Sequence, residues 1–119
     1  MCSCVELPTL IYLEDQPPSF RSSLKQIAIG NWVKLCRCQA CGRLWRVDVP
    51  DKYQPEIAIK VDAIEGWESF DSKPYVLEQL IFSRGGLSND LCIWAGCGNR
   101  AVNGVAYCAA HLYEAGARR

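Results

Sequence analysis

The alternation of hydrophobic and polar residues predicts short strands in the first half of the chain. Residues 56–64 alternate isoleucine and valine with alanine, lysine and aspartate, which is the two-residue period of a strand. The segments 32–38 and 44–49 alternate in the same way on either side of a short turn. We therefore expect these two segments to pair as a β-hairpin.

Two other segments show the spacing of an amphipathic helix. The first is expected to begin at Ser19, to place Leu24 and Ile27 on its apolar face and to end at Gly30. The second is expected to begin at Ser72 and to end before a pair of glycines. Together with a helical-looking C-terminal tail, these elements predict an α+β fold, a small antiparallel sheet with two or three helices.

Three cysteines and the only histidine of the chain share the C-terminal segment. Their spacing is C-x4-C-x10-C-x2-H, and the residues are Cys92, Cys97, Cys108 and His111. Three thiols and one imidazole form a complete ligand set for a tetrahedral zinc ion, with no coordination position left open. The spacing therefore predicts a structural zinc site rather than a catalytic one.

The order of features around these ligands resembles a treble-clef zinc finger. The second cysteine lies between two glycines, Asn103-Gly104 gives a hairpin signal between the ligand pairs, and the last two ligands begin the helical-looking tail. The resemblance covers residues 92–116 and implies a turn, a hairpin and a helix around one zinc ion.

A second group of cysteines lies towards the N-terminus. The run from Cys38 through Cys41 to Gly42 resembles the knuckle of a zinc ribbon, where glycine allows backbone N–H groups to face sulfur. The other ligands are expected to be Cys2 and Cys4, which completes a four-cysteine site. We therefore expect two zinc ions (Zn2+) per chain.

Five thiols compete for the four positions of this site. Cys36 is the spare thiol in this assignment, although it could replace Cys2, because a residue near a chain terminus is entropically harder to hold. The spare thiol leaves open a role as a redox or metal sensor. Iron is an alternative to zinc, because sites of four cysteines also bind iron.

The cysteine content also bears on the cellular compartment. Eight cysteines in 119 residues indicate either disulfides in a secreted protein or metal binding in a reducing compartment. No basic region followed by an apolar region is readable at the N-terminus, and no apolar run approaches the ~20 residues of a membrane span. These observations favour a cytoplasmic metal-binding protein.

The length of the chain favours one domain, and its hydrophobic content, 50% with four tryptophans, is sufficient for a packed core. We expect one zinc-binding domain with three parts, stapled by the two structural zinc sites. They are a zinc-ribbon-like part at 1–50, an acidic strand–helix part at 51–90 and a treble-clef-like finger at 91–119.

The charges are balanced overall, 13 basic and 13 acidic, but they are unevenly distributed. Residues 16–47 contain six basic residues and no acid, whereas residues 48–78 contain eight acids and three lysines. Large aromatic residues within a charged rim are typical of protein-binding hot spots. The candidate partner-binding residues are Glu65, Trp67, Glu68, Phe70 and Asp71.

Compact size, zero net charge and the expected metal sites together resemble small cytoplasmic bacterial immunity proteins. The resemblance implies a protein partner, a toxin whose basic active site would meet the acidic surface, with charge complementarity selecting the partner. The same acids could instead form a solvated face that pairs with the basic half of the chain.

Nucleic-acid binding is the alternative function. A basic hairpin with an interleaved tryptophan suits backbone contacts and base stacking, although the zero net charge lacks the general attraction of a DNA-binding protein. The candidate residues are Arg37, Arg43, Trp45, Arg46, Arg100, Arg118 and Arg119.

The sequence contains no recognisable catalytic motif. A cysteine nucleophile needs a nearby base, and the only histidine is expected to bind zinc. The His-x-Glu signature of zinc deaminases is also absent, because Leu-Tyr-Glu follows His111. We therefore expect a protein that is not an enzyme and has no small-molecule substrate.

Overall fold

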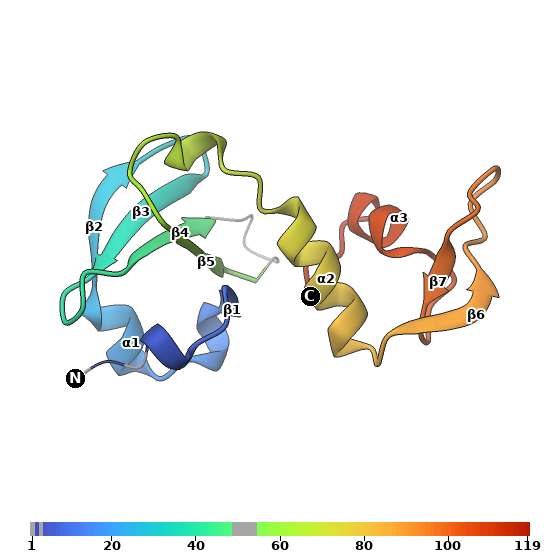
Figure 1. The fold of residues 1–119 in the computed structure, drawn as a ribbon, viewed down its shortest axis with the longest axis horizontal. Coiled ribbons are helices and arrows are strands. Elements are labelled where there is room, and N and C mark those ends of the chain that lie inside the picture. The colour runs from blue at the N-terminus through green and yellow to red at the C-terminus, as the bar shows by residue number, and fades with distance from the viewer. Residues whose placement is uncertain (1, 3, 49–54) are drawn as a thin grey trace. The chain divides into compact units, whose positions relative to one another are not determined.

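The computed structural model describes residues 2, 4–48 and 55–119, and it confirms the expected α+β fold (Figure 1). The chain forms two compact units, residues 1–71 and 72–119, and each is described by itself here. The expectation of a single domain stays a prediction. None of the helices in the described ranges is long and apolar enough to cross a membrane.

The first unit is built on a five-stranded antiparallel sheet with the strand order β1-β5-β4-β3-β2. Strands β2 to β5 follow one another as a meander, and β1 joins the sheet on the free side of β5. The strands are β1 (Leu10–Tyr12), β2 (Leu24–Ile29), β3 (Val33–Cys38), β4 (Leu44–Asp48) and β5 (Ile57–Val61). Strands β3 and β4 are the expected hairpin, and its expected last residue, Val49, lies outside the described residues.

The helix expected at residues 19–30 is wrong in its second half. Helix α1 (Pro18–Ser23) ends early, and the chain continues as β2, which pairs with β3. Leu24 packs on one face of the sheet and Ile27 on the other, so the two residues do not share the apolar face of a helix. Pairing with the edge of β3 outweighed the weak helical preference of this β-branched segment.

Both faces of the sheet are covered. Leu35 and Cys36 are neighbours in β3 and therefore point to opposite faces, and each belongs to a separate buried cluster. One cluster includes Trp45 and Phe20, beneath α1 and the 3₁₀ helices η1 (Cys4–Glu6) and η2 (Leu13–Asp15). The other cluster is capped by Trp67 from the 3₁₀ helix η3 (Trp67–Ser69).

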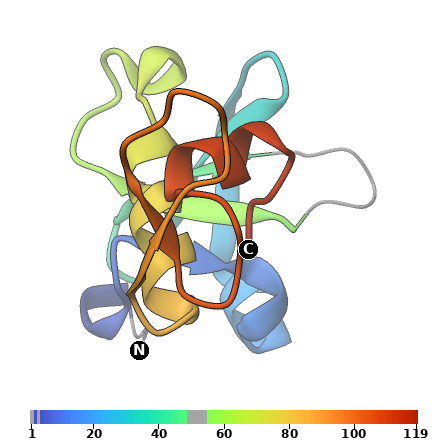
Figure 2. The same cartoon turned by 90° about the vertical axis from the view of Figure 1, so that its right-hand side faces the viewer.

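The second unit begins with α2 (Lys73–Ser83), as expected from its start and stop signals. The amide of Gly86 donates to the carbonyl of Ile81 (2.9 Å) and that of Gly85 to Phe82 (3.1 Å), which is the hydrogen-bond pattern of a Schellman end. Strands β6 (Leu87–Leu91) and β7 (Arg100–Val102) then form a two-stranded antiparallel sheet. Helix α3 (Ala109–Glu114) packs against α2 (Figure 2).

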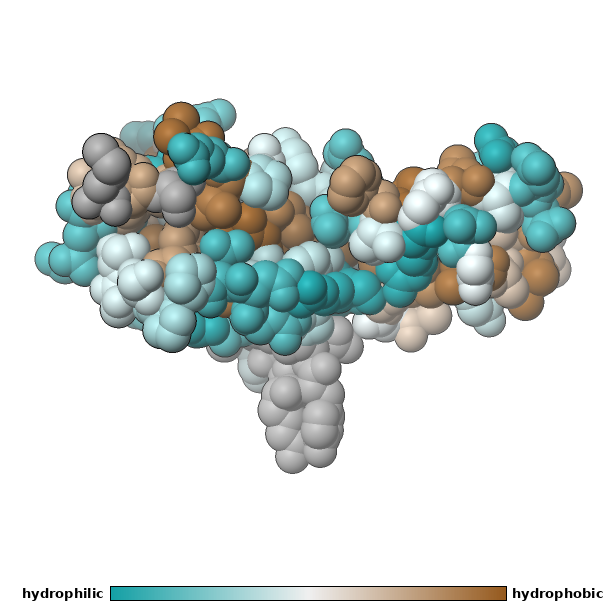
Figure 3. Space-filling model, turned by 90° about the horizontal axis from the view of Figure 1, so that it is seen from below, coloured by the Kyte–Doolittle hydropathy of each residue, from teal (hydrophilic) through white to brown (hydrophobic). Residues whose placement is uncertain are grey.

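Hydrophobic residues remain at the surface of the second unit. Figure 3 shows them in brown among hydrophilic residues at the right of the view. Leu91, Ile93 and Trp94 are 62%, 67% and 49% exposed, respectively, and they lie within four consecutive residues at and just after the end of β6, with buried Cys92 between the first two. This run of exposed apolar side chains lies beside the second cysteine group.

Candidate metal centres

The fold brings the predicted ligands together in two groups. All eight cysteines are free of disulfides. The first group is Cys2, Cys4, Cys38 and Cys41, and the second is Cys92, Cys97, Cys108 and His111. Within each group the ligand atoms all lie within 4.8 Å of one another, so each group could hold a metal ion. Cys36 belongs to neither group.

The first group is assembled by a turn between β3 and β4 and by the N-terminal segment. Cys38 ends β3, and its carbonyl accepts a hydrogen bond from the amide of Gly42 (2.8 Å). Gly42 has a φ of 80°, a left-handed conformation that glycine adopts without strain. Cys4 begins η1 and brings its sulfur to the same group. Two segments far apart in sequence therefore share one site.

Hydrogen-bond donors surround the sulfurs of the first group. Burial alone would raise the pKa of the Cys38 thiol, but backbone N–H groups of Cys41 and Ala40 bring that pKa down to about 7. Burial raises the pKa of Cys4 to about 12, although an interaction with the Trp45 indole opposes this rise. The thiolate needed for metal binding is therefore favoured at Cys38 and disfavoured at Cys4 without an ion.

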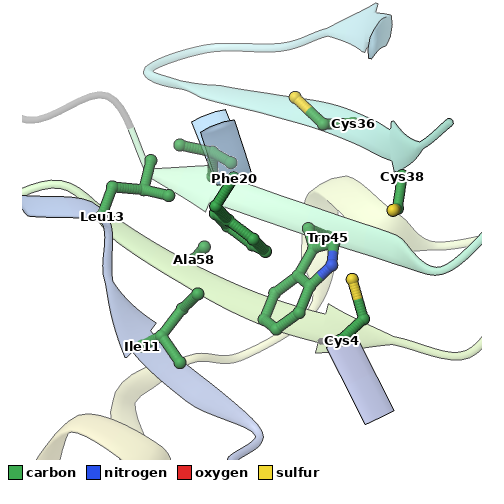
Figure 4. Packing of buried hydrophobic residues seen from close by; sticks show 9 residues of the cluster. Cys4, Ile11, Leu13, Phe20, Cys36, Cys38, Trp45 and Ala58 are labelled. Atoms are coloured by element: carbon green, nitrogen blue, oxygen red, sulfur yellow. The ribbon is translucent and has the colours of Figure 1, made fainter. Parts of the chain in front are cut away.

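Trp45 is the largest fully buried side chain of the protein (0% exposed), and its indole nitrogen lies on the side of the first group. Figure 4 shows this nitrogen directed towards the sulfurs of Cys4 and Cys38. It has no well-aligned hydrogen-bond partner among the described residues. A buried N–H without a good acceptor is costly, and a metal-bound thiolate is a stronger acceptor than a thiol. The environment of this group thus fits a metal ion.

Positive charge also lies beside the first group. An open pocket next to it is lined by Cys4 and Cys41 and by the basic side chains of Arg43 and Lys60. Four thiolates around a divalent cation carry a net negative charge. The two basic residues are placed to offset part of that charge.

The second group is assembled by the loop after β6 and by the start of α3. Cys92 follows β6 directly, and the amide of Cys97 donates to the carbonyl of Trp94 (3.0 Å), which closes a tight turn. Cys108 is the N-cap residue of α3, and His111 lies in the first turn of that helix. The chain therefore supplies two ligands from a turn and two from a helix start.

The distances in the second group match tetrahedral coordination. The Nδ1 atom of His111 lies 3.4 Å from the sulfur of Cys92 and 3.3 Å from that of Cys108. The sulfurs of Cys97 and Cys108 are 3.9 Å apart. Zn–S bonds of about 2.3 Å and Zn–N bonds of about 2.0 Å imply ligand separations of roughly 3.5–3.8 Å. Nδ1 is thus the histidine nitrogen placed to bind an ion.

The protein environment favours the charged form of one ligand in the second group. Burial would raise the pKa of Cys92, but the backbone N–H groups of Cys108 and Trp94 and the His111 side chain lower it to about 6. A preformed thiolate is the form that binds metal.

The predicted partner-binding residues lie around η3 in the first unit. Glu65, Glu68 and Asp71 are exposed, and Phe70 is half-buried. Trp67 is buried (8% exposed) and packs against the sheet, so its ring supports this surface from beneath. The acidic surface as a binding site stays a prediction.

Three of the four nucleic-acid candidates on the β3–β4 hairpin are unsuited to the predicted role, and the fourth, Arg37, is exposed. Trp45 is fully buried and cannot stack on a base, which overturns its assignment as a stacking residue. Arg43 pairs with Asp62 (3.4 Å), and Arg46 pairs with Asp48 (3.3 Å). Trp45 is buried in the core because its side chain is hydrophobic. The alternation of hydrophobic and polar residues in β4 already indicated this burial.

The C-terminal candidates are also engaged. Arg100 donates to backbone carbonyls of β6, including that of Ser88 (2.7 Å). Arg118 stacks on the ring of Tyr113 at 3.6 Å, and the terminal carbonyl of Arg119 accepts from Arg84. These contacts hold the second unit together.

The contacts that tryptophan side chains make with the two groups were not predicted from the sequence. Trp94 stacks on the ring of His111, and Trp45 faces the first group, yet neither contact is readable from spacing. The one available signal was that Trp94 lies within the C-x4-C loop. Cys36 is buried in the core, which raises the pKa of its thiol.

Both groups therefore have the donor types, separations and surroundings that a metal ion requires. Comparison with known proteins adds no family to this picture, because no family model, no curated protein and no solved structure matches the chain.

Proposed function

We propose that this protein is a protein-binding module stabilised by two structural zinc ions. The observation that carries the proposal is the pair of complete four-ligand groups, each with its ligand atoms within 4.8 Å of one another. A zinc ion held by four protein ligands has no open position for a substrate. Its free energy of binding instead contributes to folding.

The donor types favour zinc over other metals. Three cysteines with one histidine, as in the second group, form a common structural zinc set. Four cysteines bind either zinc or iron, so iron is the competing ion in the first group alone. The ribbon-like and treble-clef-like character of the two groups belongs to this proposal.

The second unit offers a surface for a protein partner. Leu91, Ile93 and Trp94 are exposed within four consecutive residues, at the strand end and loop that the second ion would hold. Contiguous exposed apolar side chains typically mark interaction sites, and tryptophan is enriched in binding hot spots. A metal-held loop would present them without an ordering cost on binding.

Inhibition of a toxin is the specific form of this proposal that the charges support. Glu65 and Glu68 are exposed in the first unit, where they could meet a basic active site. Because Trp67 is buried beneath them, the acids rather than the indole would make the contact.

Metal content is the first test. Elemental analysis combined with native mass spectrometry of the purified chain should find two zinc ions per chain. Iron in the first group would correct the identity of that ion, and absence of any metal would overturn the proposal.

Partner capture from the native host is the second test. Ile93→Ser should reduce recovery of the partner if the apolar run binds it, whereas Phe82→Ser, which changes a 79% exposed residue of the same unit, should not. For the toxin form, the double variant Glu65→Gln/Glu68→Gln should weaken binding and Glu78→Gln should not. Unchanged recovery with all of these variants contradicts both surfaces.

A further inference from the structure

The structure divides the six basic residues between positions 16 and 47 into two sets. Three of them pair with carboxylates, namely Arg21 with Glu56 (3.0 Å), Arg43 with Asp62 (3.4 Å) and Arg46 with Asp48 (3.3 Å). The other three, Lys25, Lys34 and Arg37, have no carboxylate partner in the part of the chain that the structure describes. The charge of the whole chain is balanced, but these three residues form a local excess of positive charge.

All three unpaired basic residues lie on one hairpin, formed by β2 and β3. Lys25 and Arg37 are directly opposite each other across the two strands, and both are exposed. Like charges in this position repel each other and destabilise a sheet. This pair of like charges costs stability and has no carboxylate partner in the described residues. Binding of an external anion, which would neutralise the two charges, explains the arrangement.

The turn of the same hairpin displays a tryptophan. The amide of Gly30 donates to the carbonyl of Val33 (2.8 Å), which leaves Asn31 and Trp32 as the two turn residues. Trp32 is 67% exposed and has a φ of 63°, the only positive φ of a non-glycine residue in the described ranges. A bulky side chain is strained in this conformation, which glycine adopts freely. Backbone strain of this kind is concentrated at functional sites.

We propose that the β2–β3 hairpin binds single-stranded nucleic acid. The indole of Trp32 stacks on a base, and Lys25 and Arg37, which share one face of the hairpin, contact phosphates, whereas Lys34 points to the opposite face, that of Cys36. At about 3.3 Å per residue, Trp32 and Arg37 are roughly 17 Å apart along β3, which is long enough to follow a short stretch of backbone. An exposed aromatic ring among unpaired cations favours this ligand over an acidic protein, because every base offers a face for stacking.

This binding surface differs from the one expected from sequence, which relied on the buried Trp45. It is also independent of the protein-binding proposal, which uses other residues. One acid, Glu68, lies close to the turn. Its carboxylate is so near Gly30 that a Cβ added to this glycine would lie 2.9 Å from one of the Glu68 oxygens. Its charge opposes binding of an anion at the turn.

The test is fluorescence anisotropy with labelled oligouridylate and the zinc-loaded full chain. With two phosphate contacts, affinity should fall roughly 7-fold between 50 and 200 mM salt, by the approximate slope for single strands. The double variant Lys25→Gln/Arg37→Gln should remove most of this salt dependence. Trp32→Gly should weaken binding by about 5-fold to 100-fold through loss of stacking.

Two controls make the result specific. Arg21→Gln removes the same charge from a paired position and should leave the affinity nearly unchanged. Glu68→Gln should tighten oligonucleotide binding, whereas it should weaken binding of a toxin to the acidic surface. The proposal is overturned if oligouridylate does not bind at low salt, if the hairpin variants bind like the wild type, or if only polyglutamate binds, which would indicate an acidic protein partner.

Discussion

The indole of Trp94 lies flat on the imidazole of His111, with ring centroids 4.5 Å apart and ring planes 7° from parallel. The stack joins the loop that carries Cys92 and Cys97 to the helix that carries Cys108 and His111. It therefore fixes the plane of the imidazole, whose Nδ1 lies 3.4 Å from the sulfur of Cys92 and 3.3 Å from that of Cys108. Residues that orient a metal ligand contribute to metal affinity although they do not touch the ion.

Replacement of Trp94 by alanine should weaken metal binding at the second group by roughly 10-fold to 100-fold, the usual effect of losing an orienting contact. Trp94→Phe keeps a stacking ring and should retain most of the affinity. Competition with a chromophoric chelator measures the difference. Equal affinities of the wild type and Trp94→Ala would show that the helix alone orients His111.

Ligand substitutions should remove the ions one at a time. Cys41→Ser and Cys97→Ser should each leave a single zinc, because three remaining ligands bind far more weakly than four. Cys36→Ala should retain both ions, since Cys36 lies outside both groups. Native mass spectrometry reads the stoichiometry directly. Loss of an ion from Cys36→Ala, with Cys2→Ala unaffected, would instead make Cys36 a ligand in place of Cys2.

Trp45→Phe should lower metal affinity at the first group while leaving the second group unchanged. The substitution keeps an aromatic ring in the core but removes the N–H that faces Cys4 and Cys38. Trp67→Phe is the matched control, because Trp67 is also buried but packs on the opposite face of the sheet. If both variants release zinc equally, the effect is one of packing and not of the indole N–H.

Removal of zinc should destabilise the fold, because each ion would join segments that are distant in the sequence. Addition of a strong chelator should lower the melting temperature, and added zinc should restore it. Circular dichroism during a thermal ramp provides the measurement. The Cys97→Ser variant provides the comparison, since only one ion remains for the chelator to remove. A melting temperature that does not respond to chelation contradicts a structural role.

Trp32→Gly should be neutral or should stabilise the protein by up to about 1 kcal/mol. The substitution relieves the strain of a positive φ, and this gain is partly offset by the greater chain entropy of glycine in the unfolded state. Little packing is lost, because Trp32 is 67% exposed. Trp32→Ala is the control, since alanine retains the strain and should not stabilise. Chemical denaturation compares the three proteins, and a less stable Trp32→Gly would show that the indole packs in solution.

The metal ligands were predictable because cysteine and histidine are rare and their spacing is local. The assignment of Cys2 and Cys4 rested on elimination, with Cys36 left as an alternative to Cys2. The strand β2 was not predictable in the same way. Leu24 and Ile27 are three residues apart, which is the spacing of a helix face, but in β2 they lie on opposite faces of the sheet, and a β-bulge shifts the register between Gln26 and Ala28.

The four tryptophans show where sequence reasoning reaches its limit. Trp45 and Trp67 are buried, Trp94 stacks on a ligand and Trp32 is displayed on a turn. Their hydrophobicity is identical, so only contacts between distant segments decide which of them is exposed. The same long-range contacts pair three of the basic residues and leave three unpaired.

The strand order has a consequence for the nascent chain. Strand β1 leaves the ribosome before the others, yet its partner, β5, is the last strand of the sheet to be made. Cys4 likewise cannot join its group until Cys38 and Cys41 have been made, and the group closes a loop of about 40 residues. The ligands of the second group span about 20 residues. This segment, made before the rest of the sheet, is therefore among the last parts of the sheet to be fixed. Until then its thiols and its apolar residues stay accessible to oxidants and to chaperones.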